Sequence, residues 1–260
     1  MTIVVCGDSY NIGIGCLNLR TEPYGCLLSS KLDKPLINLA KGSSTNLSIY
    51  LQVKYAVENI KNIDLCIFAN TSYDRVEWFP SNYTHKGELK NTDVNYHQYP
   101  PYGEHSYKEL LPNPITKDYK GKMFTENIRG VIDYYENFVV KKIKSGYYKR
   151  FNYEPDDKIK ILYDYGINIM DENIDKIKST GVMVMAHLLC KKNNINHLLL
   201  TDEVDRYSAF IDKKNLTYVN WGLLSKNYPD PLNTLHTSAE GHTLVYDQIY
   251  NKLIENNWVS

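Results

Sequence analysis

A serine and a histidine far apart in the chain are the residues best suited to nucleophilic chemistry. Ser9 closes the turn Gly7-Asp8-Ser9 directly after an apolar run, and His236 lies in a loop ahead of the last helical stretch. A serine hydroxyl is a weak nucleophile until a base removes its proton, and a neutral imidazole is such a base. If the fold brings His236 to Ser9, the pair predicts hydrolysis through an acyl-serine intermediate.

This reaction also needs hydrogen-bond donors for the oxyanion that forms when a serine attacks a carbonyl group. The backbone N–H groups of Ser9 and Gly42 and the side-chain amide of Asn70 are the candidates, because each residue follows a predicted strand. A third group must hold the imidazole in the tautomer that accepts the serine proton.

Charged residues near these positions are candidates for binding a substrate. Asp8 lies inside the serine turn, and Arg75 and Glu77 come shortly after Asn70. Arg75 and Glu77 could contact a carboxylate or hydroxyl of the substrate, or they could pair with each other.

Apolar runs that alternate with helical patterns predict the elements that position these residues. We expect strands at Thr2–Cys6, Pro35–Asn38, Asp64–Ala69, Lys158–Tyr163, His197–Leu200 and Leu216–Asn220. We expect helices at Asn46–Ile60 (capped by Thr45), Thr125–Lys144, Ile174–Asn193 and Ala239–Asn256. The alternation predicts an α/β fold, a three-layer α/β/α flavodoxin-like sandwich with a central parallel sheet. Ligands of such sheets bind beyond the carboxyl ends of the strands.

Residues from about 75 to 124 interrupt this alternation. They hold most of the prolines and many of the tyrosines, and they show little periodicity. The stretch is too long for an ordinary connection. We therefore expect a single domain over residues 1–260, with this segment as an insertion or lid after the third strand.

The overall composition argues against several classes of protein. The 260 residues carry no formal net charge, so no basic surplus predicts nucleic-acid binding. No apolar run is long enough to predict a membrane span, and no signal peptide precedes the first strand. The five cysteines lack C-x-x-C spacing, which predicts reduced thiols and a cytoplasmic protein.

Metal and cofactor signatures are also missing from the sequence. No set of histidine and acidic residues has metal-ligand spacing, and Gly13-Ile14-Gly15 matches neither phosphate-loop pattern. His187 and His242 are expected to pack in the core and at the start of a helix. His85, His97 and His105 fall in the insertion, where they could line a groove or lie on the surface.

Four short blocks, in this order, resemble those of the SGNH (GDSL-like) hydrolases. They are Val5-Cys-Gly-Asp-Ser9-Tyr, Asn38-Leu-Ala-Lys-Gly42, Phe68-Ala-Asn70-Thr and Asn233-Thr-Leu-His236, with Ser238-Ala-Glu-Gly241-His242 as a continuation. The blocks span nearly the whole chain. The resemblance implies Ser9 as nucleophile, His236 as base, and Ser9, Gly42 and Asn70 as the oxyanion hole.

Two departures from the family pattern bear on activity. The third block lacks its Gly and its following Asp, and the last block has Asn233 where the family has Asp. In a serine protease the same Asp-to-Asn change costs about 10⁴ in turnover. Asp230 could take the acid's place, a backbone carbonyl could orient His236, or the site could be catalytically relaxed.

These observations predict a serine esterase that removes small acyl groups, with carbohydrate O-acetyl esters as substrates by family analogy and by the stacking of tyrosines on sugars. The alternative is a binding or structural module of the same fold, for example in a phage particle. The Lys-, Asn-, Ile- and Tyr-rich composition is typical of AT-rich genomes, including those of phages. The expected binding partner is a small ester or an acylated carbohydrate. The chain could also assemble into a homo-oligomer or a virion, so we expect a cytoplasmic or virion-associated location. A flavodoxin-like nucleotide binder is disfavoured by the missing phosphate loop.

Overall fold

The computed structural model describes residues 2–42, 44–73, 75–78, 124–127, 157–232 and 234–259, with the backbone alone for 76–78, 124–127 and 157–162. A five-stranded sheet forms its centre, with every neighbouring pair of strands parallel and the order β2-β1-β3-β6-β7. The strands are β1 (Thr2–Cys6), β2 (Leu36–Asn38), β3 (Ile63–Ala69), β6 (Asn196–Thr201) and β7 (Leu216–Tyr218). The expected α/β sandwich is confirmed.

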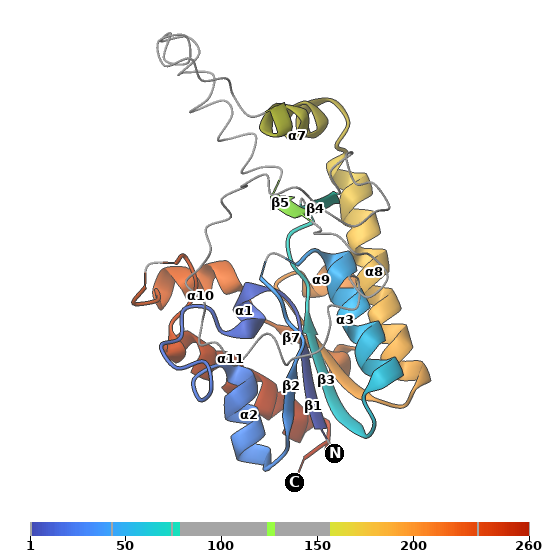
Figure 1. Ribbon diagram of the computed structural model, residues 1–260. Helices are drawn as coiled ribbons and strands as arrows, with labels where there is room; N and C mark the ends of the chain where they lie inside the picture. The colour runs from blue at the N-terminus through green and yellow to red at the C-terminus, as the bar shows by residue number, and fades with distance from the viewer. Residues whose placement is uncertain are drawn as a thin grey trace, which may run out of the picture.

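Helices cover both faces of this sheet, as Figure 1 shows. On one face lie α3 (Asn46–Asn59), α8 (Glu172–Lys192) and the short α9 (Val204–Ser208). The other face carries α2 (Tyr24–Leu32), α10 (Trp221–Asn227) and α11 (Ala239–Glu255). The short α1 (Ser9–Ile12) follows β1, and a 3₁₀ turn (Lys213–Asn215) precedes β7.

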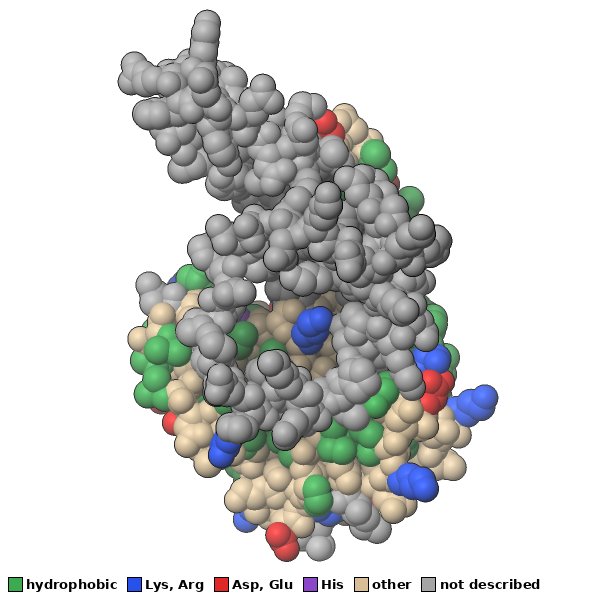
Figure 2. Space-filling view, viewed as in Figure 1, with side chains coloured by type: hydrophobic (Ala, Val, Ile, Leu, Met, Phe, Trp, Pro, Cys, Tyr) green, Lys and Arg blue, Asp and Glu red, His purple; other side chains and the backbone are tan. Residues whose placement is uncertain are grey.

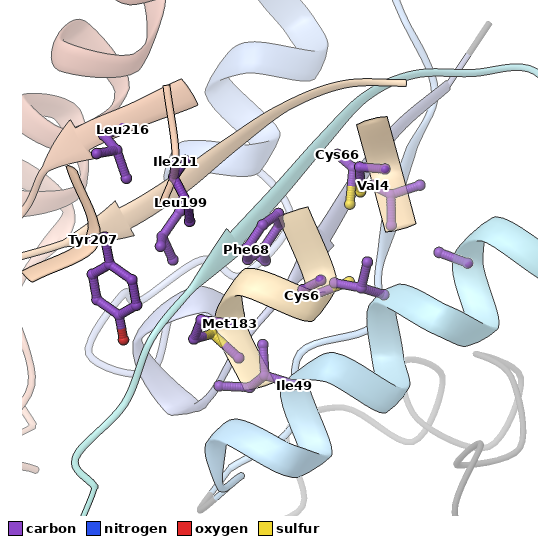
Figure 3. Packing of buried hydrophobic residues seen from close by; sticks show 14 residues of the cluster. Val4, Cys6, Ile49, Cys66, Phe68, Met183, Leu199, Tyr207, Ile211 and Leu216 are labelled. Carbon is purple, nitrogen blue, oxygen red and sulfur yellow. The ribbon is translucent and has the colours of Figure 1, made fainter. Parts of the chain in front are cut away.

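Alternation along each strand explains the two apolar layers. Val4 and Cys6 of β1 point toward α3 and α8, whereas Ile3 and Val5 point toward α2 and α11. Both faces of a parallel sheet are covered, so consecutive strand residues can all be apolar. Figure 3 shows the first layer, in which Met183 and Phe68 pack together.

The cap expected for α3 is present. The Thr45 hydroxyl accepts the N–H of Ser48, which satisfies one of the free donors at the helix start. The cysteines Cys6 and Cys66 are buried between sheet and helices, as expected of small core residues, and all five cysteines are free thiols.

Two expected elements differ from the structure. Lys158–Tyr163, expected as a strand, lies in helix α7 (Asp157–Asn168), because the apolar series continues at helical spacing past Tyr163. Residues 125–127, expected to begin a helix, belong to β5 (Phe124–Asn127), which pairs antiparallel with β4 (Arg75–Trp78). The rest of that helix, and the interior of the expected insertion, lie outside the described residues.

No helix in the described part of the chain is long and apolar enough to cross a membrane.

Candidate active site

Three loops meet at the carboxyl edge of the sheet, after the neighbouring strands β2, β1 and β3. The N–H of Lys41, in the second loop, donates to the carbonyl of Gly7 at 3.1 Å. The Thr71 hydroxyl, in the third loop, donates to Asp8 Oδ2 at 2.9 Å. These bonds hold the loops that carry Gly42 and Asn70 against the turn that carries Ser9.

Two buried amides of α3 tie the same loops to the helix layer. Gln52 accepts the Gly7 N–H at 2.7 Å and donates to the Gly7 carbonyl and to the Ser44 hydroxyl. Asn46 accepts the Thr71 N–H at 2.9 Å and donates to the Thr71 carbonyl. Buried backbone groups need such partners, so α3 fixes the shape of the candidate site from behind.

Ser9 and His236 lie in direct contact. Ser9 is the first residue of α1, whose N-cap is Asp8, and its side chain is largely buried. His236 Nε2 lies 2.8 Å from Ser9 Oγ, although 227 residues separate them in sequence. This is the distance expected of a hydrogen bond between a hydroxyl and a base.

The other ring nitrogen of His236 fixes the tautomer. Nδ1 lies 2.8 Å from the backbone carbonyl oxygen of Thr234. Because a carbonyl oxygen only accepts, Nδ1 carries the ring proton and Nε2 has a free lone pair for the Ser9 hydroxyl. Burial lowers the pKa of His236, more than the bond to the Thr234 carbonyl raises it. The imidazole is therefore neutral at neutral pH.

Asp230 organises the loop that carries His236, and its hydrogen bonds go to the backbone and to Thr234, not to the imidazole ring. Its Oδ2 accepts the His236 N–H and the Thr234 hydroxyl, each at 3.0 Å, and Oδ1 accepts the Leu232 N–H at 2.8 Å. Burial raises the pKa of Asp230, but the bonds from Thr234, His236 and Leu232 outweigh it and the net pKa is lowered. The Thr234 hydroxyl also lies 3.1 Å from His236 Nδ1, so it bridges carboxylate and ring.

The same loop contains a strained residue and packs on a glycine. Leu235 has φ +65°, a left-handed conformation that is unfavourable for a branched side chain. Gly15 has φ +104°, and a Cβ there would lie 2.3 Å from the Thr237 carbonyl oxygen and 2.9 Å from Asp230 Cβ. Gly15 thus allows the close approach of the two loops.

The charged residues proposed to bind substrate have mixed surroundings. Asp8 Oδ2 pairs with Arg75 at 3.1 Å, and Asp8 Oδ1 accepts the N–H of Tyr10. Arg75 also donates to the Ser44 carbonyl at 3.1 Å. Arg75 is therefore engaged with Asp8, and the side chain of Glu77 lies outside the described residues. Substrate binding by these three residues stays a prediction.

An open cavity of about 320 Å³ is lined by Asp8 and Tyr10, the residues on either side of Ser9. Its aromatic side is formed by Tyr10 and Trp221, whose rings stack with centroids 5.1 Å apart; Tyr10 also contacts the His236 ring. Its polar lining includes Asn70, Arg75 and Asp202. Figure 2 shows a Lys or Arg side chain exposed among the described residues near the middle of this view.

The expected oxyanion donors lie at this edge of the sheet. Among the described residues, neither the Ser9 N–H nor the Gly42 N–H has a hydrogen-bond acceptor. Asn70 lines the cavity, and its backbone N–H donates to the Leu200 carbonyl at 3.2 Å. Asn233 lies outside the described residues.

The remaining histidines of the described chain have core surroundings. His187 Nδ1 lies 2.7 Å from His197 Nε2, as expected of a satisfied core residue. His242 is fully buried at the start of α11 and stacks on Tyr24, and burial lowers its pKa to about 4. No group of three or more potential ligands among the described residues could hold a metal ion. His85, His97 and His105 lie outside these residues.

Several residues of the site were not singled out from the sequence. Tyr10 and Trp221 had no distinguishing signal, since aromatic residues are frequent throughout the chain. Thr234 sits inside the resemblance block, but its role depends on the loop conformation. Gly15 was noted only as part of a failed phosphate-loop pattern; two glycines two residues apart do indicate a tight turn.

Comparisons with known proteins find a distant likeness among solved structures. No protein-family model matches the chain, and no curated protein matches it. Among solved structures, it is similar to a protein assigned to the G-D-S-L family of lipolytic proteins from Desulfitobacterium hafniense DCB-2. The two are 14% identical with a TM-score of 0.34, over 97% of this chain and 99% of the other.

Proposed function

We propose that this protein is a serine hydrolase of ester bonds, with Ser9 as nucleophile and His236 as general base. The observation that carries the proposal is the 2.8 Å contact between Ser9 Oγ and His236 Nε2. The two side chains come from distant parts of the sequence to the carboxyl edge of the sheet, and Asp8 and Tyr10, the neighbours of Ser9, line an open cavity there. The four sequence blocks that resemble SGNH hydrolases support the same roles.

In the proposed reaction, Ser9 Oγ attacks the ester carbonyl carbon while His236 Nε2 takes the hydroxyl proton. The N–H groups of Ser9 and Gly42 and the Asn70 amide would stabilise the oxyanion. The intermediate then expels the alcohol, which takes the proton from His236, and leaves an acyl-Ser9 ester. A water molecule, deprotonated by His236, hydrolyses this ester and restores the Ser9 hydroxyl.

In this proposal the Thr234 carbonyl orients the His236 ring, and the Asp230 carboxylate acts on the ring indirectly, through the Thr234 hydroxyl. The carbonyl, 2.8 Å from Nδ1, holds the ring in the productive tautomer. The imidazolium that forms during the reaction keeps this bond, and the negative charge of Asp230 stabilises it through the bridging Thr234 hydroxyl. Without a carboxylate on the ring, we expect slower turnover than a full triad supports.

The cavity favours a small substrate with a flat, hydroxyl-bearing part. Its volume of about 320 Å³ is at the lower end for small-molecule sites. The stacked rings of Tyr10 and Trp221 offer an apolar wall, and Asn70 and Asp202 offer hydrogen-bonding groups nearby. We therefore propose an O-acetylated carbohydrate as the substrate class.

The test combines p-nitrophenyl acetate turnover with labelling by a fluorophosphonate probe. Wild-type protein should turn over the ester and be labelled at Ser9, and both signals should vanish in Ser9→Ala and His236→Ala. Ser30→Ala, an exposed serine on α2, is the matched control and should behave as wild type. Labelling that persists in Ser9→Ala, or no turnover from pH 6 to 9, would reject the proposal.

A second candidate is a binding module of the same fold with a relaxed site. The favouring observation is that no carboxylate of the described residues forms a hydrogen bond with the His236 ring. Calorimetric binding of an acetylated oligosaccharide without its hydrolysis would support this role over the enzyme.

A further inference from the structure

Helix α8 exposes an apolar face along most of its length. Its inner side packs on α3 and the sheet, whereas four large side chains point away from the core; their exposed fractions are Ile174 50%, Ile177 70%, Met185 47% and Leu188 52%. Figure 1 shows α8 as the outermost helix on its side of the sheet. A surface helix normally carries polar residues on this face, and a row of large apolar ones indicates an interaction site.

The exposed residues are arranged symmetrically about Gly181. Ile174 and Leu188 lie seven residues before and after it, and Ile177 and Met185 lie four before and after. When two identical helices pair antiparallel about a two-fold axis, a residue before the crossing point faces its counterpart after it in the partner. Every apolar residue of the row would therefore meet an apolar residue of the second copy.

We propose that α8 is the interface of a homodimer, in which two copies pair antiparallel with Gly181 at the crossing point. The proposal is independent of the esterase function. Its occupant is a second copy of this chain, because the spacing about Gly181 is the same in both directions and therefore matches an antiparallel copy of itself.

Gly181 itself supports a close crossing. A glycine within a helix costs about 0.5–1 kcal/mol relative to alanine. Within the described residues nothing explains this cost, because a Cβ at Gly181 would meet no atom within 4 Å. At a helix crossing, the missing side chain lets the two backbones approach and lets the flanking side chains interlock.

The charges at the helix ends select the antiparallel arrangement. Asp171 caps the start of α8 and Lys191 lies in its last turn, ten residues before and after Gly181. An antiparallel pair brings the acidic first turn of one copy, with Glu172 and Asp175, near the basic last turn of the other, whereas a parallel pair would bring like charges together. Lys191 is already 3.4 Å from Asp212, but both side chains are exposed and the pair is weak.

The interface is modest in size, so the dimer should form reversibly. Exposed Ile167 and Ile169, just ahead of α8, would extend the contact toward the end of the partner's helix. A helix of 21 residues is about 31 Å long, and one such pair buries less than the roughly 800 Å² per partner of a standard interface. We expect a dissociation constant of the dimer on the order of micromolar.

Sedimentation velocity of the full chain from 1 to 100 µM tests the dimer. The wild type should shift with concentration from the 30.2 kDa monomer toward twice that mass. Ile177→Glu and Met185→Glu should each keep it monomeric with an unchanged melting temperature. Ile254→Glu, an equally exposed site on α11, is the matched control and should still dimerise.

Cysteine crosslinking tests the orientation. Mixing Ile177→Cys with Met185→Cys protein should give a disulfide-linked dimer, and Ile177→Cys alone should crosslink much less. Strong self-crosslinking of Ile177→Cys means a parallel pair and overturns the proposal. A monomer at all concentrations overturns it too, as does a dimer that survives both Glu substitutions. If Ile177→Glu instead lowers the melting temperature of a monomer, the chain's own residues cover this face, which also overturns it.

Discussion

Replacing Asp230 with Asn separates two ways in which this carboxylate could serve His236. Asp230 Oδ2 accepts the His236 N–H and the Thr234 hydroxyl at 3.0 Å, and the carboxylate does not contact the ring. In Asp230→Asn one oxygen becomes an NH₂ group, so the His236 N–H loses its acceptor. A hydrogen bond to a charged group contributes about 1.5–3 kcal/mol. If the energy of this hydrogen bond serves to hold His236 in its reactive position, its loss lowers kcat/KM by about 10- to 150-fold.

The assay is kcat/KM for p-nitrophenyl acetate, with thermal unfolding measured in parallel. Asp247→Asn makes the same chemical change at an exposed position of α11 and should leave both values unchanged. Thr234→Val removes the bridging hydroxyl but keeps the carbonyl that accepts from Nδ1, so its loss should be smaller than that of Asp230→Asn. An NMR signal from a protected His236 Nδ1–H should persist in Thr234→Val.

Two outcomes would refute this reasoning. A loss near 10⁴-fold in Asp230→Asn, as large as that of His236→Ala, would mean that the carboxylate acts on the ring directly, as a triad acid does. An unchanged kcat/KM would mean that the loop holds its shape without Asp230, despite the strained backbone at Leu235.

Three further predictions concern pH and packing. Since the pKa of His236 is lowered and its neutral form is the base, the acid limb of kcat/KM should inflect below the ordinary imidazole value of about 6.5; an inflection above it would contradict the burial argument. The pKa of His242 is about 4 in the folded protein, below the value of about 6.5 for an exposed imidazole. As the pH drops from 6.5 to 4, the unfolded chain therefore binds a proton that the folded protein does not. The free energy of unfolding should fall by up to about 3.4 kcal/mol over this range. His242→Phe should remove that part of the slope in urea titrations at several pH values, and an equally steep slope would refute the assignment. Gly15→Ala should reduce esterase activity at least tenfold by displacing the His236 loop, whereas Gly181→Ala, where a Cβ meets no atom within 4 Å, should not; equal activities would show that the loops can move apart.

The fold was predictable because its signals are local and repeated. A long apolar pattern with a single period marks strand β3 and helices α3, α8 and α11. The predicted bounds of these elements therefore agree with the observed bounds within a few residues. The strand predicted at Lys158–Tyr163 was wrong, because alternating Lys and Ile residues resemble a strand over a short window. Its helix becomes visible only when the window extends to Asn168.

The reactive pair of the candidate site was predictable, but its supporting groups were not. Ser9 and His236 stand out because their side chains can act as nucleophile and base. The orienting carbonyl of Thr234 is a backbone group, and every residue has one. Its position depends on the left-handed Leu235 and on five bonds to Asp230, which arise only once the loop has folded.

The contact between Ser9 and His236 also has a consequence for how the protein is made. Strand β1 is synthesised before β2 and β3, although it lies between them in the sheet, and Ser9, just after β1, is synthesised 227 residues before His236. The His236 loop is anchored by α11, which packs on α2. Contacts of such long sequence separation form late in folding. A nascent chain can therefore complete its inner strands while the Ser9 hydroxyl still lacks a base, so esterase activity should appear abruptly when α11 docks.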